Sequence, residues 1–556
     1  MALKLIRLLI MMIVMVPDFI VQFAVGAKKP PNIVILMADD MGFDDVSFRG
    51  SNEFLTPNID ALAFNGVILN NYYVPAMCTP SRASLLTGKN PINIGMQHYV
   101  IPNDQPWGLP LTEKTMAQYF KEAGYFTSLI GKWHLGFSKK SYTPLYRGFD
   151  HHFGYYGGYV DYYDQTTYST SSHYSRGHDF RNNLNVTRSN QGTYVTDSLT
   201  EEAERLIRNH NTEIPLLMIV SQLAPHSGNP DEPFQAPSDE IKKFHYIPNV
   251  NRSIYAAMVS KLDQSVGKVV QALDTKGILT NTILLFYSDN GAPTLGLHSN
   301  EGSNYPFRGQ KNSPWEGGIR SSAAIWSPLI RNGGRIWNQT MHVSDWLPTL
   351  ASAAGIQLSD DLHLDGLNLW TNLTKGEDPV LRQIVQNIDD IFQYVSYTRG
   401  KWKYINGTTQ RGNYDGWLSD REKVHIDPRS HRYEEEVKNS ITWKTLVQFM
   451  QTDEIDDTNI VELRQKASIN CSHDKEISRC EPLLDECIFN LVEDPCEQNN
   501  LIGRMRNSRL LQKIRREVEE YRSKAVAPVG KPSDPRCDPK YYDNEWTWWE
   551  DIYSRS

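Results

Sequence analysis

The chain has 556 residues and 40% of them are hydrophobic, so it is long enough for two domains with a sizeable core. Its formal net charge is −8, from 57 basic and 65 acidic residues, which argues against nucleic acid as the main partner. An anionic substrate would therefore need a local basic pocket.

The N-terminus has the pattern of a secretory signal peptide. A basic start precedes an apolar run from Leu8 to about Val25, and small residues follow it. A retained signal anchor is the alternative, but Pro17 and Asp18 interrupt the run. We predict a signal peptide over residues 1–27, no stable membrane anchor, and a secretory route to the lysosome or the cell exterior. Six Asn-x-Ser/Thr sequons suit a glycoprotein on this route: Asn185, Asn251, Asn338, Asn372, Asn406 and Asn470.

Four apolar runs predict buried strands, and amphipathic segments between them predict helices. This alternation favours an α/β fold with an open, mostly parallel sheet flanked by helices. The predicted strands are 31–38, 125–131, 215–220 and 282–287, and the predicted helices are 56–66, 112–124, 196–209 and 255–273.

Polar residues follow each of these strands directly. In such a sheet, ligands bind beyond the carboxyl ends of the strands, so we expect the polar residues to converge on one edge. For any single residue, ordinary strand-end polarity is the simpler explanation, but it explains four strands together poorly. The residues are Asp39, Asp40, Lys132, His134, His226, Asp289 and Asn290.

The segment 77–88 predicts a tight turn that opens a helix. Thr79 is a good N-cap, Pro80 suits the first helical position, and Gly88 is placed to end the helix. Cys78 would then lie just outside the helix N-terminus, which favours anions, with Arg82 in the first turn. On position alone, a disulfide or a buried thiol is the more ordinary interpretation of Cys78.

The second part of the chain has a different character. We predict a glycine- and tyrosine-rich loop over 154–163 and a helix that opens at 342–350. We then expect an antiparallel hairpin over 394–407, loops and insertions over 411–470, a short strand over 487–491 and a terminal helix over 510–525. The predicted domains are a catalytic α/β domain, 28–392, and a smaller C-terminal domain, 393–556, with an antiparallel sheet.

Five of the six cysteines lie in the last fifth of the chain, which predicts a disulfide-stapled region in an oxidising compartment. Six cysteines can pair evenly, whereas removing Cys78 leaves an odd number, so the count by itself favours a disulfide at Cys78. The other five are Cys471, Cys480, Cys487, Cys496 and Cys537.

The strand-end residues offer two kinds of chemistry. Asp39, Asp40, Asp289 and Asn290 offer only oxygen ligands, which selects a hard cation, and their irregular mix suits calcium better than magnesium. The basic side chains would form a pocket for a tetrahedral oxyanion next to the metal. They are Arg82, Lys132, His134, His226 and Lys311.

Several motifs together resemble the type I sulfatase family, over roughly residues 31–350. In family order they are Asp39-Asp40, Cys78-Thr79-Pro80-Ser81-Arg82, Gly131-Lys132-Trp133-His134, Ala224-Pro225-His226, Ser288-Asp289-Asn290-Gly291 and Arg308-Gly309-Gln310-Lys311. The segments 149–163, 315–318 and 342–350 look most like the arylsulfatase B group.

The resemblance implies an alkaline-phosphatase-like fold and a sulfuric ester hydrolase. It implies that the formylglycine-generating enzyme converts Cys78 to formylglycine, whose hydrate attacks sulfur with one hydroxyl and expels sulfate by losing the proton of the other. Calcium would be bound by the four oxygen-bearing side chains together with residue 78. Arg82 and His134 would hold the diol, and Lys132, His226 and Lys311 would hold the sulfate and assist the leaving alcohol.

The resemblance also bears on the substrate and on the odd cysteine. It suggests a sulfated glycosaminoglycan sugar such as N-acetylgalactosamine 4-sulfate; a small aryl sulfate is equally compatible with the core motifs. In the family a late cysteine bridges to the region matching 100–110, which here contains no cysteine, so Cys537 is expected to be unpaired.

Two rival functions differ from a sulfatase in one feature each. A phosphatase or phosphodiesterase of the same superfamily would normally bind zinc and would need more histidine ligands than this set provides. A non-catalytic protein that binds sulfated glycans would keep Cys78 unconverted. The presence of every motif residue argues against such a loss of activity.

Overall fold

The computed structural model describes residues 29–169, 175–375, 382–419, 425–449, 460–471 and 478–553. The signal peptide predicted over residues 1–27 lies outside these ranges. Within them, no helix combines the length and the apolar character that crossing a membrane requires.

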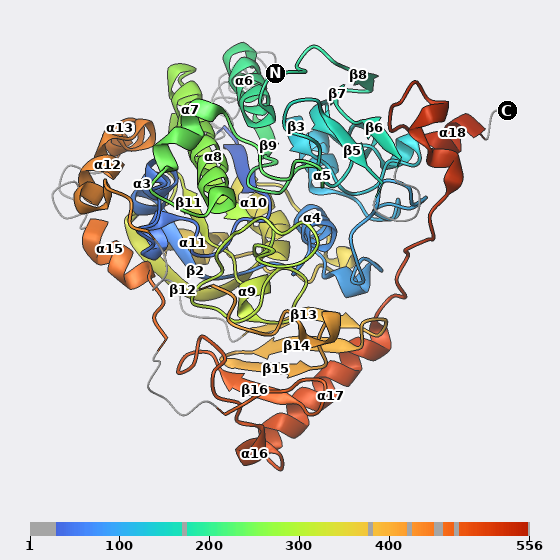
Figure 1. Cartoon of the computed structure of the whole chain (residues 1–556), viewed down its shortest axis with the longest axis vertical. Helices are drawn as coiled ribbons and strands as arrows, with labels where there is room; N and C mark the ends of the chain where they lie inside the picture. Colours follow the sequence, from blue (N-terminus) through green and yellow to red (C-terminus); the bar gives the residue numbers. More distant parts are fainter. Residues whose placement is uncertain are drawn as a thin grey trace, which may run out of the picture.

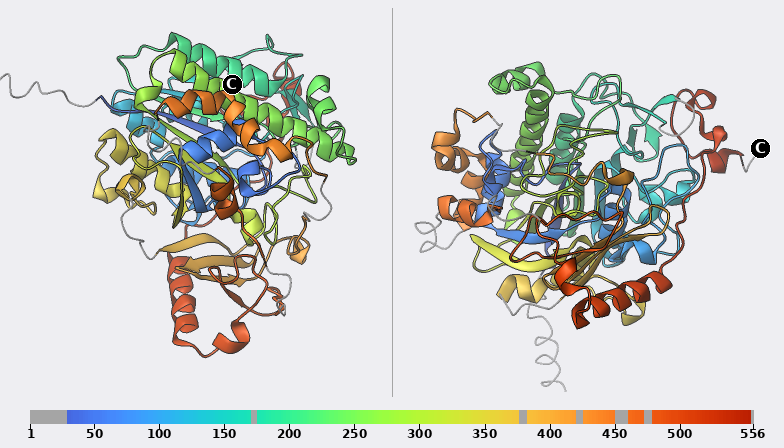
Figure 2. Two further views of the ribbon diagram at one scale, coloured as in Figure 1. Left: turned by 90° about the vertical axis from the view of Figure 1, so that its left-hand side faces the viewer. Right: turned by 60° about the horizontal axis from the view of Figure 1, so that its bottom comes forward.

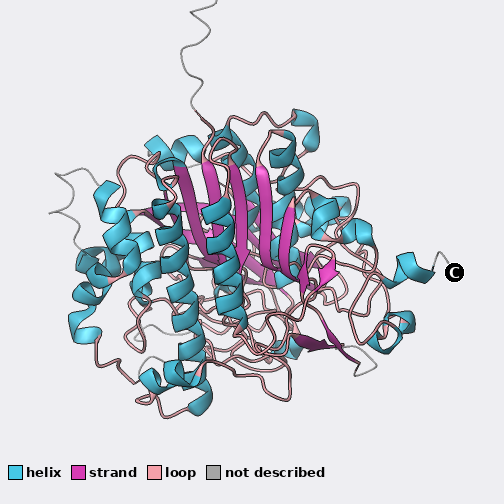
Figure 3. Ribbon diagram, turned by 90° about the horizontal axis from the view of Figure 1, so that it is seen from above, coloured by secondary structure: helices cyan, strands magenta, loops and turns pink. Residues whose placement is uncertain are grey.

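A ten-stranded sheet forms the centre of the molecule (Figure 3), with the order β12-β2-β11-β10-β1-β9-β3-β4-β7-β8. Its five central strands are parallel, which confirms the predicted mostly parallel sheet and all four predicted strands. These strands are β10 (Thr282–Ser288), β1 (Asn32–Ala38), β9 (Leu216–Ser221), β3 (Phe126–Lys132) and β4 (His151–Tyr155). The outer strands are β12 (Arg335–His342), β2 (Val67–Tyr73), β11 (Ala323–Trp326), β7 (Arg181–Asn182) and β8 (Asn185–Val186).

Both faces of this sheet are buried, because side chains alternate along each strand. In β1, Val34 and Leu36 join one apolar cluster, whereas Ile33 and Ile35 join another on the opposite face. The first cluster includes α3 (Pro57–Asn65), α6 (Val195–Asn209) and α8 (Val250–Thr275). The second includes α4 (Cys78–Thr87), α5 (Met116–Glu122) and α10 (Trp346–Ala354). The helices therefore cover the sheet on both sides, as Figure 3 shows.

A separate four-stranded antiparallel sheet lies below the large one in Figure 1 and in the left view of Figure 2. It consists of β13 (Gln383–Asp389), β14 (Tyr394–Arg399), β15 (Trp402–Asn406) and β16 (Cys487–Asn490), and α17 (Arg509–Lys524) packs along it. The predicted hairpin, short strand and terminal helix are confirmed. Leu511 and Ile514 of α17 share an apolar cluster with Val395 and Tyr397 of β14.

The segment predicted to be loops over 411–470 instead contains helices, and this prediction was wrong. They are α12 (Tyr433–Asn439), α13 (Ile441–Leu446) and α15 (Ile460–Ala467), and they lie beside α3 in Figure 1. These helices are only six to eight residues long, so no extended periodic pattern marks them. They are held by contacts with distant elements: Trp443 and Leu446 enter the cluster around α3 and α8, and the Tyr433 hydroxyl donates to Asp60.

Two predicted boundaries were also wrong. The helix predicted from 112 begins at Met116, because Thr115 and Gln118 form a capping box there. The loop predicted over 154–163 begins later, since Gly154 and Tyr155 belong to β4. The remaining short elements are β5 (Thr166–Tyr168), β6 (Arg176–His178), α7 (Ser238–Ile241), α9 (Glu316–Ile319), α11 (Trp370–Lys375) and α16 (Ile502–Met505).

The C-terminal tail leaves α17 and returns to the large sheet, ending in α18 (Trp549–Tyr553; Figure 1). Trp546 and Trp549 are buried in the same apolar cluster as α4 and α5. Two disulfides, Cys471–Cys496 and Cys480–Cys487, staple the region between α15 and α16. Cys78 and Cys537 are both buried and free, which confirms that Cys537 is the unpaired late cysteine.

Candidate active site

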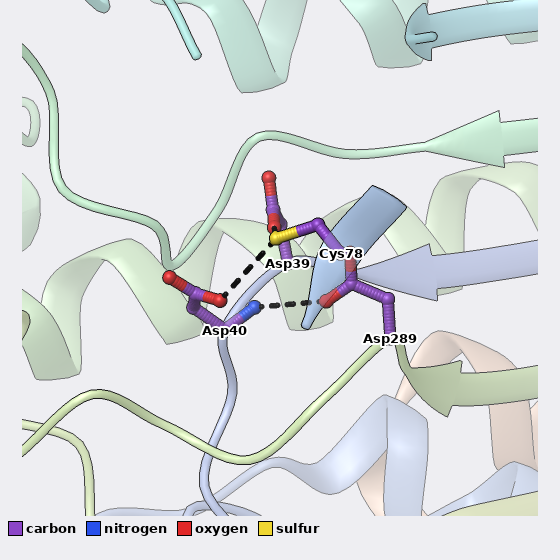
Figure 4. A group of neighbouring side chains, drawn as sticks. All are labelled: Asp39, Asp40, Cys78 and Asp289. Atoms are coloured by element: carbon purple, nitrogen blue, oxygen red, sulfur yellow. Dashed lines mark hydrogen bonds between the residues drawn. The ribbon is translucent and has the colours of Figure 1, made fainter. Parts of the chain in front are cut away.

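The ends of two central strands bring acidic side chains to one buried point beside the N-terminus of α4 (Figure 4). Asp39 and Asp40 follow β1, Asp289 follows β10, and Cys78 is the first residue of α4. The Cys78 Sγ lies 3.7 Å from Asp39 Oδ1 and 3.9 Å from Asp40 Oδ1. One ligand atom from each of these four residues lies within 4.8 Å of the others. The predicted convergence of strand ends is therefore present in the structure.

The helix that carries Cys78 begins two residues earlier than predicted, so Cys78 lies in its first position and not just outside it. Its N-cap is Met77, which provides no side-chain cap, so the assignment of Thr79 as the N-cap was wrong. The Thr79 hydroxyl instead donates to the His134 carbonyl at 2.9 Å and accepts from the Ile101 amide at 3.2 Å. Gly88 ends the helix in the left-handed region (φ 67°), as predicted.

Three cations neutralise the acidic cluster. Arg82 donates to Asp289 Oδ2 at 2.8 Å, and Lys132 lies 2.7 Å from Asp39 Oδ2. Burial raises the pKa of Asp39 to about 7, although Lys132 opposes that shift. Lys311 lies 2.6 Å from Asp40 Oδ2. Burial also disfavours ionisation of Asp40, but Lys311 and the neighbouring basic groups outweigh it and hold the pKa of Asp40 below its ordinary value.

Two predicted histidines line the cavity that adjoins this acidic cluster. His226 Nε2 lies 3.4 Å from Asp40 Oδ2, and its Nδ1 lies 2.6 Å from the Ser227 carbonyl, which requires a proton on Nδ1. His134 adopts a left-handed backbone conformation (φ 57°) and its Nδ1 has no hydrogen-bond partner among the described residues. Burial and the nearby cations lower the pKa of both imidazoles well below the ordinary value.

The donor set fits a hard cation. Asn290 follows Asp289, and its Nδ2 donates to Asp40 Oδ1 at 2.6 Å. Its Oδ1 is buried and accepts no hydrogen bond within the part of the chain that the structure describes. A buried acceptor without a donor is costly, and a cation would satisfy it. Three carboxylates and one amide oxygen suit calcium or magnesium better than zinc.

As a cysteine, residue 78 is poorly suited to act as a nucleophile. Burial raises the pKa of its thiol to about 12, so the sulfur stays protonated at neutral pH. It is also not held in a disulfide.

A cavity of about 370 Å³ opens above this cluster. Cys78, His134, His226 and Lys311 all contribute to its wall. The cavity therefore joins the acidic cluster to the surface and has the size of a small-molecule site.

Sequence reasoning missed several residues of this site. Ser221, the last residue of β9, accepts a 2.6 Å hydrogen bond from Arg82, and only its strand-end position signals this role. His298 lines the cavity with a left-handed backbone (φ 58°), and no sequence pattern marks it. Tyr159, by contrast, belongs to the predicted glycine- and tyrosine-rich loop; it stacks on His226 with ring centroids 5.5 Å apart, and its ring lies 4.6 Å from that of His298.

The geometry defines a hydrolytic site for an oxyanion ester, with oxygen ligands for a cation and basic side chains at the strand ends. Comparisons with known proteins narrow this class. A family model described as Sulfatase matches residues 31–356. Mouse arylsulfatase J is 35% identical over 94% of this chain and 81% of its own length. Human N-acetylgalactosamine-6-sulfatase is 32% identical over 64% of this chain and 67% of its own.

Solved structures agree with this result. The crystal structure of Ps i-CgsB superposes with a TM-score of 0.68 and 26% identity, and the match covers 90% of this chain and 94% of that one. The chain belongs to the sulfatase family and is a sulfuric ester hydrolase. The more specific resemblance to the arylsulfatase B group stays a prediction.

Proposed function

We propose that this enzyme hydrolyses sulfate monoesters through a formylglycine made from Cys78, with calcium bound beside it. The observation that supports this most is the position of the Cys78 side chain, between buried carboxylates and a cavity lined by basic groups. A thiol that stays protonated and forms no disulfide has no evident role there, whereas a hydrated aldehyde supplies one hydroxyl as a nucleophile toward sulfur and a second that allows sulfate to leave.

Asp39, Asp40, Asp289 and Asn290 would hold the calcium ion together with an oxygen of residue 78. The bound ion would supply positive charge that offsets the carboxylates and the sulfate. The unpartnered Asn290 Oδ1 supports this assignment.

The basic residues would each have a separate task. Arg82, fixed by Asp289 and Ser221, and His134, with its unpartnered Nδ1, would hold the hydroxyl groups of residue 78. Lys132, Lys311 and His226 would bind the sulfate oxygens and assist the departing alcohol. Lys311 and His226 line the cavity itself, whereas Lys132 is buried against Asp39.

We propose a sulfated sugar such as N-acetylgalactosamine 4-sulfate as the substrate. The names of two similar proteins support a sugar as the substrate: N-acetylgalactosamine-6-sulfatase, and Ps i-CgsB in complex with k-i-k-neocarrahexaose. Small aryl sulfates are a second candidate, because Leu295 and Leu297 are 49% and 64% exposed and line the cavity.

Maturation and destination remain as predicted from the sequence. The formylglycine-generating enzyme would act on the chain in the secretory pathway, and the mature enzyme would be lysosomal or secreted. Sugar attachment at the six sequons is compatible with their exposure: Asn372 is partly exposed, and Asn185, Asn251, Asn338, Asn406 and Asn470 are exposed.

Mass spectrometry of the peptide that contains residue 78 tests the proposal, on protein secreted from eukaryotic cells. We expect a sulfur-free aldehyde at this position, and hydrolysis of an aryl sulfate but not of the matching aryl phosphate. Cys78→Ala serves as the inactive control. An intact thiol together with no sulfate release would contradict the proposal, and faster phosphate release would favour the phosphatase alternative.

A further inference from the structure

A second cavity, of about 480 Å³, adjoins the catalytic one. Tyr99, Val100 and Gln410 line both cavities, so the two share a wall. Its volume is within the range of about 300–1,000 Å³ that is usual for small-molecule sites. A substrate that extends from the catalytic cavity past Tyr99 would enter it.

Three segments that are far apart in the sequence, together with Gln410, build this second cavity. They are 95–107 near the large sheet, 391–392 in the turn between β13 and β14, and 528–531 in the tail. The tail is pinned by the Val529 amide, which donates to the Gly95 carbonyl at 3.0 Å. The turn is held by Asp389, which accepts from the amides of Ile391 and Phe392 at 2.9 and 3.0 Å. The walls are thus fixed without a ligand.

The lining of this cavity combines aromatic rings with polar groups. The Phe392 ring lies 4.5 Å from that of His98 and 6.2 Å from that of Tyr99. Asp389 holds His98 Nδ1 at 2.9 Å, and no hydrogen bond to the second ring nitrogen occurs within the described residues. Aromatic faces bind the apolar faces of sugar rings, and a free ring nitrogen can bond to a hydroxyl.

The two cavities differ in whether their lining offers an unpaired lysine. In the catalytic cavity, Lys311 is the only lysine or arginine among the described lining residues, and it is already paired with Asp40. In the second cavity, Lys531 is exposed and makes no ion pair within the described residues. An anionic group one sugar away from the cleaved ester would therefore meet a cation only in the second cavity.

We infer that this second cavity is a subsite for the sugar next to the sulfated one, and that it takes an acidic sugar such as a uronate. Phe392 would pack on the sugar ring, and Lys531 would bind its carboxylate. This inference rests on the proposed function and specifies an oligosaccharide, rather than a single sugar or an aryl ester, as the preferred substrate.

The test compares two substrates with the mature enzyme. One is N-acetylgalactosamine 4-sulfate, and the other is a chondroitin 4-sulfate tetrasaccharide with that sugar at its non-reducing end. We expect a higher kcat/KM for the tetrasaccharide. For this substrate, Lys531→Ala should raise KM about three- to fivefold, and Phe392→Ala about tenfold. Hydrolysis of the monosaccharide should not change, and Lys531→Arg should keep most of the affinity.

Lys513→Ala is the matched control, because Lys513 is an exposed lysine of α17 outside both cavities. Equal kcat/KM for the two substrates, or variants that slow both alike, would overturn the subsite. If neither sugar nor an aryl sulfate were hydrolysed, the proposed function itself would fail, which is a separate outcome.

Discussion

A buried lysine between two carboxylates connects the two sheets and provides the sharpest stability test. Lys403 of β15 lies 2.9 Å from Glu316 Oε1 and 2.6 Å from Glu497 Oε1, and all three side chains have no exposed surface. Glu316 also accepts from the Tyr73 hydroxyl at 2.9 Å, and its amide donates to Glu497 at 2.8 Å. Glu316 begins α9, in the segment just after Lys311.

Lys403→Met would remove the charge and keep most of the volume. Two buried carboxylates would then face each other without their cation, and breaking a buried ion pair in this way costs about 3–5 kcal/mol. We expect the free energy of unfolding, measured by urea titration at pH 7, to fall by that amount. The loss should shrink at pH 5, because protonation of a carboxylate relieves the repulsion.

Lys401→Met is the matched control on the same sheet. Lys401 lies 3.9 Å from Glu493, both side chains are exposed, and pairs of this kind contribute about 0–1 kcal/mol. If Lys403→Met lost no more stability than Lys401→Met, the buried triad would not stabilise the contact between the sheets.

Three further predictions concern pH and the active site. Burial raises the pKa of Glu497 to about 7, so the folded protein keeps a proton that the unfolded chain loses near pH 4.5. The free energy of unfolding should therefore fall as the pH rises between these values. Glu497→Gln should flatten that slope in urea titrations. Lys311→Ala should lower kcat/KM for an aryl sulfate about 10²–10³-fold, whereas Lys540→Ala, at an exposed tail lysine paired with Asp538, should not change it. A Cβ at Gly158 would lie 2.9 Å from Cε1 of His134, so Gly158→Ala should displace that ring. We expect kcat/KM to fall by about 10–100-fold with an unchanged thermal unfolding midpoint. Full activity would show that the imidazole position is not important.

The sequence predicted those parts of the fold that depend on local pattern. Continuous apolar runs such as that of β1 mark strands buried on both faces, and the polar residues after them meet because parallel strands end at one edge. The meeting of Asp39, Asp289 and Lys132 at this edge of the sheet therefore follows from the sequence pattern.

Elements that depend on long-range contacts escaped prediction. The helices α12 and α13 are only seven and six residues long and are held by contacts with α3 and α8. The burial of Trp546 and the wall formed by Lys531 depend on where the tail returns, which no local pattern encodes. The N-terminus of α4 was misplaced because the Thr79 hydroxyl bonds to a distant carbonyl instead of capping its own helix.

A crystal structure of the mature enzyme, purified from eukaryotic cells in calcium, tests the central claim most directly. Electron density should show a hard cation contacting the carboxylates of Asp39, Asp40 and Asp289 and the amide oxygen of Asn290, next to a residue 78 that carries oxygen instead of sulfur. A metal-free cluster around an unmodified Cys78 thiol would contradict the account.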